Sequence, residues 1–155
     1  MGAGKSTVGG LLASALKLPF VDLDDVVVQF AKMPISEVFS TMGEASFRAI
    51  EADALRHVLA GPACVLALGG GTVHQPGAAE SVRTRMPIIV LDAPLAVLQR
   101  RVGHDPTRPL ATTLSRLYRE RAPALRTLGP VVRTAGRSPA DVVTEVCALL
   151  ASEIR

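Results

Sequence analysis

Aromatic residues are scarce in this sequence: it has no tryptophan, one tyrosine and four phenylalanines, which together make up 3% of its 155 residues. Proteins that bind single-stranded nucleic acid usually stack bases on several aromatic rings. Lysines and arginines form no long run, although the formal net charge is +3. We therefore expect no nucleic-acid partner, and we interpret the small positive surplus as local anion binding.

Cysteines and long apolar runs are also few. Cys64 and Cys147 both lie in apolar segments without a metal-ligand spacing, so we interpret them as buried small residues of a reducing compartment. No apolar run reaches the roughly 20 residues of a membrane span, and the chain opens without the apolar segment of a secretory signal. We expect a cytoplasmic protein with no membrane partner, and a monomer.

The composition that remains is that of a globular protein. Apolar residues make up 48% of the sequence and charged residues 20%, a balance that lets a chain of this length bury a core. No repeat, low-complexity tract or linker divides it. We therefore expect residues 1–155 to form one domain.

The chain opens on a glycine-rich segment, Met1-Gly2-Ala3-Gly4-Lys5-Ser6-Thr7, that leads into an apolar-periodic stretch. It matches the later part of the phosphate-binding pattern G-x-x-x-x-G-K-[ST]. The glycines let backbone N–H groups point at phosphate oxygens, Lys5 adds a compact charge, and Ser6 offers a hydroxyl to Mg²⁺. The alternative is a turn that only caps a helix, but Gly-Lys-Ser-Thr favours nucleotide binding.

Apolar periodicity predicts helices that alternate with buried strands. We expect helices at about 5–16, 24–31, 34–43, 47–59, 95–101, 114–121 and from 138 onward, and strands at 20–24, 64–68, 87–92 and 131–134. This order is typical of a three-layer α/β/α fold with a parallel sheet and helices on both faces. A P-loop normally follows a central strand, and no such strand stands before Met1 in this sequence. We therefore expect either that the protein starts earlier or that this chain lacks its first strand.

Two carboxylates, Asp22 and Asp24, end the strand predicted at 20–24. Strand alternation would turn both to the same face at the carboxyl edge of the sheet, where α/β proteins bind ligands. One could organise hydrated Mg²⁺ while the other accepts a hydroxyl proton. The alternative is that both cap the following helix.

Two further motifs suggest a binding site for a small acid. Arg48 and Glu51 form an i, i+3 pair, which is either a surface ion pair of little worth or a pair that aims Arg48 at a substrate carboxylate. Gly69, Gly70 and Gly71 follow a buried strand, and three glycines leave room for a ligand against bare backbone. The alternative is a simple tight turn, which would need only one or two of these glycines.

Two arginines lie farther along the chain. Arg108 falls in a polar stretch at about 103–113 that lacks apolar periodicity, which suggests either a lid that closes over phosphates or a solvated loop. Arg121 precedes Ala122-Pro123 at an expected helix end, where it could complement the helix dipole or act as a second substrate clamp.

Together these residues resemble the shikimate kinase family over nearly the whole chain. In chain order the matching motifs are Gly-Lys-Ser-Thr, Phe-x-Asp-x-Asp, Gly-Glu-x-x-Phe-Arg-x-x-Glu, Leu-Gly-Gly-Gly, Arg-Pro-Leu and Arg-x-Pro. The third and fourth are the most discriminating. The resemblance implies a P-loop kinase of the nucleoside-monophosphate-kinase-like fold, with five parallel strands, that phosphorylates the 3-hydroxyl of shikimate with ATP and Mg²⁺.

The resemblance also implies residue roles. The ATP site would comprise Gly2, Ala3, Gly4, Lys5, Ser6, Thr7, Arg101, Arg108, Arg137 and Pro139. Shikimate would contact Asp24, Arg48, Gly69, Gly70, Gly71 and Arg121, near Phe39 and Phe47. Lys5, Asp24 and Arg108 would be catalytic, with Asp24 as the base. Ser6 would ligate Mg²⁺, and Asp22 would hold its water shell.

Two alternatives stay open. The first is another small-metabolite kinase of the same fold, such as a gluconate kinase. The second is a catalytically impaired nucleotide-binding remnant, which the missing strand favours, as does Ala67 at a position where the family usually carries Ser or Thr.

Overall fold

The computed structural model describes residues 2–102 and 114–153, so the lid expected at 103–113, with Arg108, lies outside the described residues. Its helices are α1 (Lys5–Leu16), α2 (Leu23–Ala31), α3 (Ile35–Ala60), α4 (Ala78–Arg83), α5 (Leu95–Val102), α6 (Leu114–Leu125) and α7 (Pro139–Glu153). Its strands are β1 (Phe20–Asp22), β2 (Val65–Ala67), β3 (Val90–Asp92) and β4 (Val131–Arg133), and η1 (Thr72–His74) is a short 3₁₀ helix. Only α4 and η1 were not predicted, because each is too short to show a period.

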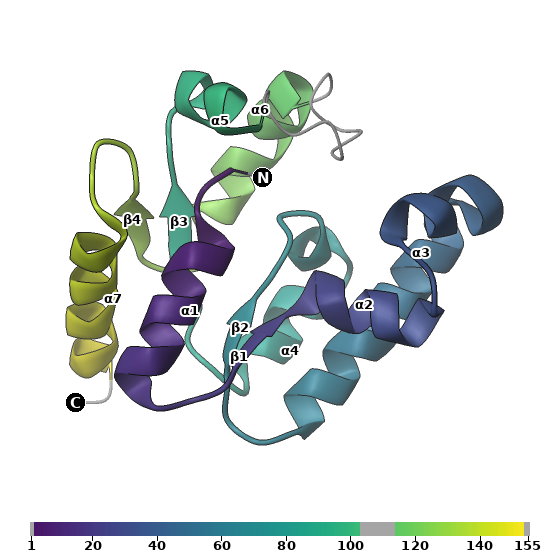
Figure 1. Ribbon diagram of the computed structural model, residues 1–155, viewed down its shortest axis with the longest axis horizontal. Coiled ribbons are helices and arrows are strands. Elements are labelled where there is room, and N and C mark those ends of the chain that lie inside the picture. Colours follow the sequence, from purple (N-terminus) through teal and green to yellow (C-terminus); the bar gives the residue numbers. More distant parts are fainter. Residues whose placement is uncertain (1, 103–113, 154–155) are drawn as a thin grey trace.

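The strands form two separate parallel pairs, which corrects the single sheet predicted from the sequence. Phe20 of β1 lies opposite Val65 of β2, and Val90 of β3 lies opposite Val131 of β4. Helix α1 contacts α7, β1 and β2, and it runs between the two pairs in Figure 1. Within the described residues, no strand bridges the two pairs.

Strand β1 is shorter than predicted because a side chain starts the next helix. The carboxylate Oδ1 of Asp22 accepts a hydrogen bond from the backbone N–H of Asp24 at 3.2 Å, and Asp22 is the N-cap of α2. Asp24 therefore lies in the first helical turn and not in the strand. The strand predicted to carry both aspartates therefore ends at Asp22, so strand alternation does not relate them. Of the two, Asp22 alone is the N-cap of α2.

Two helices depart from regular geometry. The break predicted at Gly43 is confirmed as a kink inside α3, where Gly43 has φ 78° and ψ 172°. Helix α6, in contrast, continues through Pro123 to Leu125, past the end predicted at Arg121. A proline this close to a helix end removes only one hydrogen bond of the last turn, so the helix ends two residues later.

Three apolar clusters hold these elements together. The first joins α2, α3 and α4 through Leu23, Val27, Val38, Phe47, Ala54, Leu55 and Val82. The second joins α1, β4 and α7 through Val8, Val132, Val142, Val143 and Val146, and the third joins α5 and α6 through Ala93, Leu98, Val102 and Leu114. Cys64 and Cys147 are unpaired and only partly buried, although the sequence predicted buried residues, and Cys147 packs against the second cluster. Among the described residues, no helix combines the length and apolar content needed to cross a membrane.

Candidate active site

The glycine loop enters α1 in a backbone conformation that favours glycine. Gly2 has φ 72° and Gly4 has φ 91°. A Cβ atom added to Gly2 would lie 3.0 Å from Cγ2 of Val102 and 3.3 Å from the carbonyl oxygen of Leu98. Helix α1 has no side-chain cap, so its first N–H groups stay available for an anion.

Ser6 and Asp22 bring two oxygen donors together beside this loop. The hydroxyl Oγ of Ser6 donates a hydrogen bond to Oδ2 of Asp22 at 3.0 Å, which links the start of α1 to the end of β1. Hydroxyl and carboxylate oxygens suit Mg²⁺, which usually keeps water and phosphate ligands as well. In the part of the chain that the structure describes, no three His, Cys, Asp or Glu side chains gather to form an all-protein metal cage. These residues therefore fit a metal ion that takes a few oxygen ligands from the protein and the others from a nucleotide and water.

Asp24 lies at the same end of the fold as Lys5. Burial raises the pKa of Asp24 above its ordinary value of 3.8, and the negative charge of Asp22 raises it further. The positive charge of Lys5 acts in the opposite direction. Asp24 is thus a more basic carboxylate than usual, within the field of the loop lysine.

Arg48 of α3 and Arg121 of α6 converge on one glycine. A Cβ atom added to Gly71 would lie 3.1 Å from Nη1 of Arg48 and 3.1 Å from Nη1 of Arg121. The bare backbone of Gly71 is what allows the two guanidinium groups to approach. Nε of Arg48 is buried and has no hydrogen-bond partner among the described residues. Two cations and an unpartnered N–H make this point suitable for a carboxylate.

The surface interpretation of the Arg48–Glu51 pair is wrong. Glu51 is only 3% exposed, and its Oε2 accepts from Nη1 of Arg48 at 2.7 Å. Its other oxygen, Oε1, accepts from Oγ1 of Thr72 at 2.6 Å. Thr72 was not predicted; its only signal in the sequence is a polar residue directly behind the glycine turn. Glu51 is therefore a buried anchor that fixes the direction of Arg48.

One cavity lies apart from the two arginines. It has a volume of about 180 Å³ and lies between α3 and the η1–α4 segment, where Glu51 and Thr72 border it. Lys5, Arg48 and Arg121 do not line it. This cavity is thus behind the anchor of Arg48 and is distinct from the site formed by the loop and the two arginines.

An apolar wall stands beside the two arginines. The rings of Phe39 and Phe47 have their centroids 4.5 Å apart, and Cζ of Arg48 lies 5.0 Å from the centre of the Phe47 ring. On the other side, Cδ1 of Leu125 would lie 3.5 Å from a Cβ atom at Gly70. The predicted substrate residues therefore gather within one region, apart from the contribution of the lid.

Arg101 connects the glycine loop to β4. Its Nη1 donates to the carbonyl oxygen of Gly2 at 3.0 Å and to Oγ1 of Thr134 at 3.2 Å. Its Nη2 donates to the carbonyl oxygen of Thr134 at 3.2 Å. Arg101 thus holds the loop against the end of β4.

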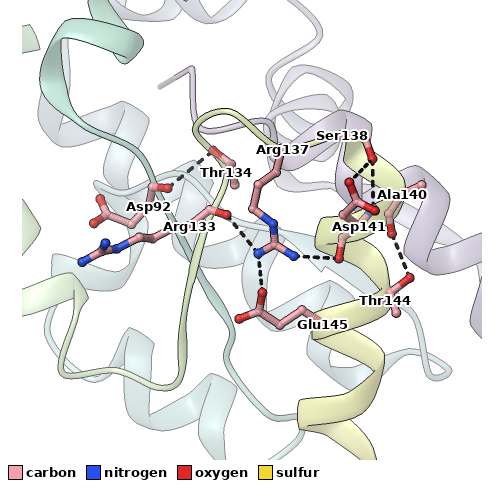
Figure 2. A network of polar contacts seen from close by, with 9 residues as sticks. All are labelled: Asp92, Arg133, Thr134, Arg137, Ser138, Ala140, Asp141, Thr144 and Glu145. Atoms are coloured by element: carbon pink, nitrogen blue, oxygen red, sulfur yellow. Dashed lines mark hydrogen bonds and ion pairs between the residues drawn. The ribbon is translucent and has the colours of Figure 1, made fainter.

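Arg137 is held between β4 and α7, as Figure 2 shows. It donates to the carbonyl oxygens of Arg133 at 3.4 Å and Asp141 at 3.0 Å, and it pairs with Glu145. Pro139 is the first residue of α7. These two residues lie around the start of α7 and not at the arginine pair.

The uncapped glycine loop and the parallel α/β fold define the class of P-loop nucleotide-binding proteins. Within that class, carboxylates beside the loop lysine are the groups that transfer of a phosphoryl group to a hydroxyl uses. The chain is in this sense a P-loop kinase.

Comparisons with known proteins agree with this class and narrow it. The family model described as shikimate kinase matches residues 1–151. The shikimate kinases of Rhodococcus jostii and Limosilactobacillus fermentum are 36% and 40% identical to this chain; each match covers 97% of it, and 93% and 91% of the relatives. The solved shikimate kinase from Acinetobacter baumannii in complex with shikimate superimposes with a TM-score of 0.92 at 30% identity, over 99% of this chain and 89% of that one. The chain belongs to the shikimate kinase family, which confirms the resemblance and the fold class.

Proposed function

We propose that this chain transfers the γ-phosphoryl group of ATP to the 3-hydroxyl of shikimate, giving shikimate 3-phosphate. The observation that carries the proposal is the convergence of Arg48 and Arg121 on Gly71. Two guanidinium groups against bare backbone suit the carboxylate of a small acid. Shikimate carries such a group, and the relative from Acinetobacter baumannii is solved in complex with it.

At the other end of the site, the loop from Gly2 to Thr7 binds the phosphates of ATP. Its N–H groups and the ammonium group of Lys5 neutralise their charge. Ser6 ligates Mg²⁺ directly and Asp22 holds its water shell, and the metal, when bound, adds further charge neutralisation. Arg108, within the lid that we propose at 103–113, closes over the phosphates.

Asp24 acts on the hydroxyl group of the substrate. It lies between the loop with Lys5 and the anchor Glu51, both of which influence its titration. Its raised pKa suits a group that takes the hydroxyl proton as the oxygen attacks phosphorus. Phosphoryl transfer depends mainly on positioning and charge neutralisation, so this proton transfer is a supporting step.

The adenine side lies around the start of α7. Arg101 contributes by holding the loop through its hydrogen bond to Gly2, and Arg137 contributes by tying the end of β4 to the first turn of α7. We propose that residues 1–155 form one kinase domain that works as a monomer in the cytoplasm.

An assay of Arg48→Ala tests the substrate site. We expect the KM for shikimate to rise by about tenfold or more, because a charge-assisted bidentate contact is worth about 1.5–3 kcal/mol, while the KM for ATP changes little. The measurement is ATP consumption in a coupled assay. Arg56→Ala is the matched control, since Arg56 lies on the same helix and pairs with Asp53 at the surface.

The same assay separates the alternatives. Turnover of gluconate in place of shikimate would identify a different small-metabolite kinase. A thermal shift with ATP and Mg²⁺ but no turnover of either acid would identify a nucleotide-binding protein without catalysis. An unchanged KM for shikimate in Arg48→Ala would refute the arginine clamp.

A further inference from the structure

The end of α6 is tied to the end of strand β3. Nε and Nη2 of Arg126 donate to Oδ2 of Asp92 at 3.1 and 2.8 Å, and Nη2 also donates to the hydroxyl of Tyr118 at 3.0 Å. Asp92 is the last residue of β3, and its side chain is only 20% exposed. The hydrogen bond to Asp92 and the negative charge of Asp92 raise the pKa of Arg126.

A second arginine holds the same segment from α4. Nη2 of Arg83 donates to the carbonyl oxygens of Thr127 at 3.1 Å and Leu128 at 3.0 Å. These carbonyls directly follow the last turn of α6, where a helix leaves carbonyl groups without internal partners and attracts cations. The segment after α6 is therefore held by one arginine of its own and by one from another helix.

The backbone also leaves this segment little freedom to move. A Cβ atom added to Gly129 would lie 2.0 Å from the carbonyl oxygen of Ile88. The chain therefore approaches the residues before β3 more closely than any side chain would permit. Together with Asp92, this contact fixes the end of α6 against β3.

Helix α6, whose end these contacts fix, carries Arg121, one of the two arginines that converge on Gly71. Arg121 lies on α6, five residues before Arg126, which directly follows the helix, and Nη1 of Arg121 points at Gly71. Leu125, next to Arg126, faces Gly70. Because a helix moves as a rigid rod, a shift of its last turn would move Arg121 relative to Arg48.

The position of Arg121 also has to be maintained against electrostatic repulsion from Arg48. Arg48 and Arg121 present like charges at the same glycine, which is unfavourable until an anion lies between them. Glu51 compensates Arg48 directly at 2.7 Å. The contacts at the end of α6 hold the helix in place instead.

We propose that Asp92 and Arg126 are positioning residues that fix α6 so that Arg121 faces Arg48 across the carboxylate of shikimate. Arg83 of α4 supports the same segment through the carbonyl oxygens of Thr127 and Leu128. Neither Asp92 nor Arg126 contacts the substrate. This inference rests on the proposed function and adds the groups that set the geometry of its acid-binding end.

A double-mutant cycle tests the proposal. In Arg126→Ala we expect the KM and the Kd for shikimate to rise about three- to tenfold, while kcat and the KM for ATP stay near the wild-type values. In an Arg121→Ala background, the same substitution should add less than about twofold, because the residue that it positions is gone. Arg126→Lys should recover part of the loss.

The control is Arg116→Ala, which removes another arginine of α6, one that pairs with Glu120 at 3.3 Å on the surface. It should leave the Kd for shikimate unchanged. If Arg126→Ala does not fold, Asp92→Asn removes the charge of the acceptor at nearly constant shape and enters the same cycle.

An equal rise in the Kd for shikimate in both backgrounds would show a general structural effect and overturn the proposal, as would no rise in either. Failure of the proposed function has a different signature: the wild-type chain would then neither bind nor phosphorylate shikimate, and the positioning role would fall with it. If the wild-type chain binds shikimate normally and the effects of Arg126→Ala and Arg121→Ala on the Kd simply add, the positioning role is rejected but the proposed function is not.

Discussion

At the scale of single residues, the carboxylate of Asp24 lies where its charged form is unfavourable. Burial and the neighbouring charge of Asp22 raise its pKa, and Lys5 only partly compensates. Because the folded pKa lies above 3.8, ionisation of Asp24 destabilises the folded chain at neutral pH, and the penalty disappears as the pH falls below 3.8. Such a group is expected at a catalytic position, where stability is given up for chemistry.

Asp24→Asn tests this account. Without ligands at pH 7, we expect the variant to be more stable to urea than the matched variant Asp25→Asn, by less than about 1 kcal/mol because Asp24 keeps solvent contact. Both aspartates lie in the first turn of α2, so the comparison cancels the loss of charge at the helix dipole. The difference should vanish near pH 3, while turnover of shikimate in Asp24→Asn falls strongly at any pH. An equal difference at both pH values would contradict the assigned pKa shift.

At the scale of elements, α1 serves the site and the core together. No side chain caps the N–H groups of its first turn, and its later turns pack against α7 and the strands β1 and β2. The ring of Phe20 comes so close to the helix that a Cβ atom at Gly9 would lie 2.4 Å from Cε2. A Cβ atom at Gly10 would meet nothing within 4 Å.

The two neighbouring glycines make a matched pair of variants. Alanine at an open helical position raises stability by about 0.5–1 kcal/mol, so we expect Gly10→Ala to stabilise the chain by that amount. Gly9→Ala should lower the free energy of unfolding by about 1 kcal/mol or more, because overpacking against Phe20 exceeds the gain in helix propensity. Urea unfolding measures both. If Gly9→Ala stabilised the chain as much as Gly10→Ala, the contact with Phe20 would be refuted.

At the scale of the whole molecule, the candidate site draws on both strand pairs. Asp22 is the last residue of β1 and Gly71 follows β2, whereas the end of α6, which carries Arg121, is tied to β3 through Asp92. A ligand that contacts both groups of elements therefore stabilises the chain as a whole. Such binding appears as a shift in the melting temperature.

We expect shikimate at about 100 times its Kd to stabilise the protein by about 2.7 kcal/mol, which raises the melting temperature by several degrees. At that same concentration the shift should be much smaller in Arg48→Ala and also in Arg121→Ala, although the two arginines come from different parts of the fold. Gluconate serves as the control ligand. A full shift in either variant would show that the acid binds elsewhere.

Short-range signals in the sequence predicted much of this protein. The glycine loop, the extent of α1 and the kink at Gly43 depend on neighbouring residues, and the alternation of helices with strands predicted that the strands run parallel. The motif order was enough to indicate the family, because its residue types are those that bind phosphate and carboxylate.

The tertiary structure decided what depends on distant partners. The burial of Glu51 requires Thr72, and the direction of Arg121 requires both Gly71 and the pair of Arg126 with Asp92. The hydrophobic period of a segment indicates which of its faces is buried. It does not indicate which polar groups from other segments that face will contact. The partners of these side chains were therefore determined only when packing brought together residues far apart in the chain.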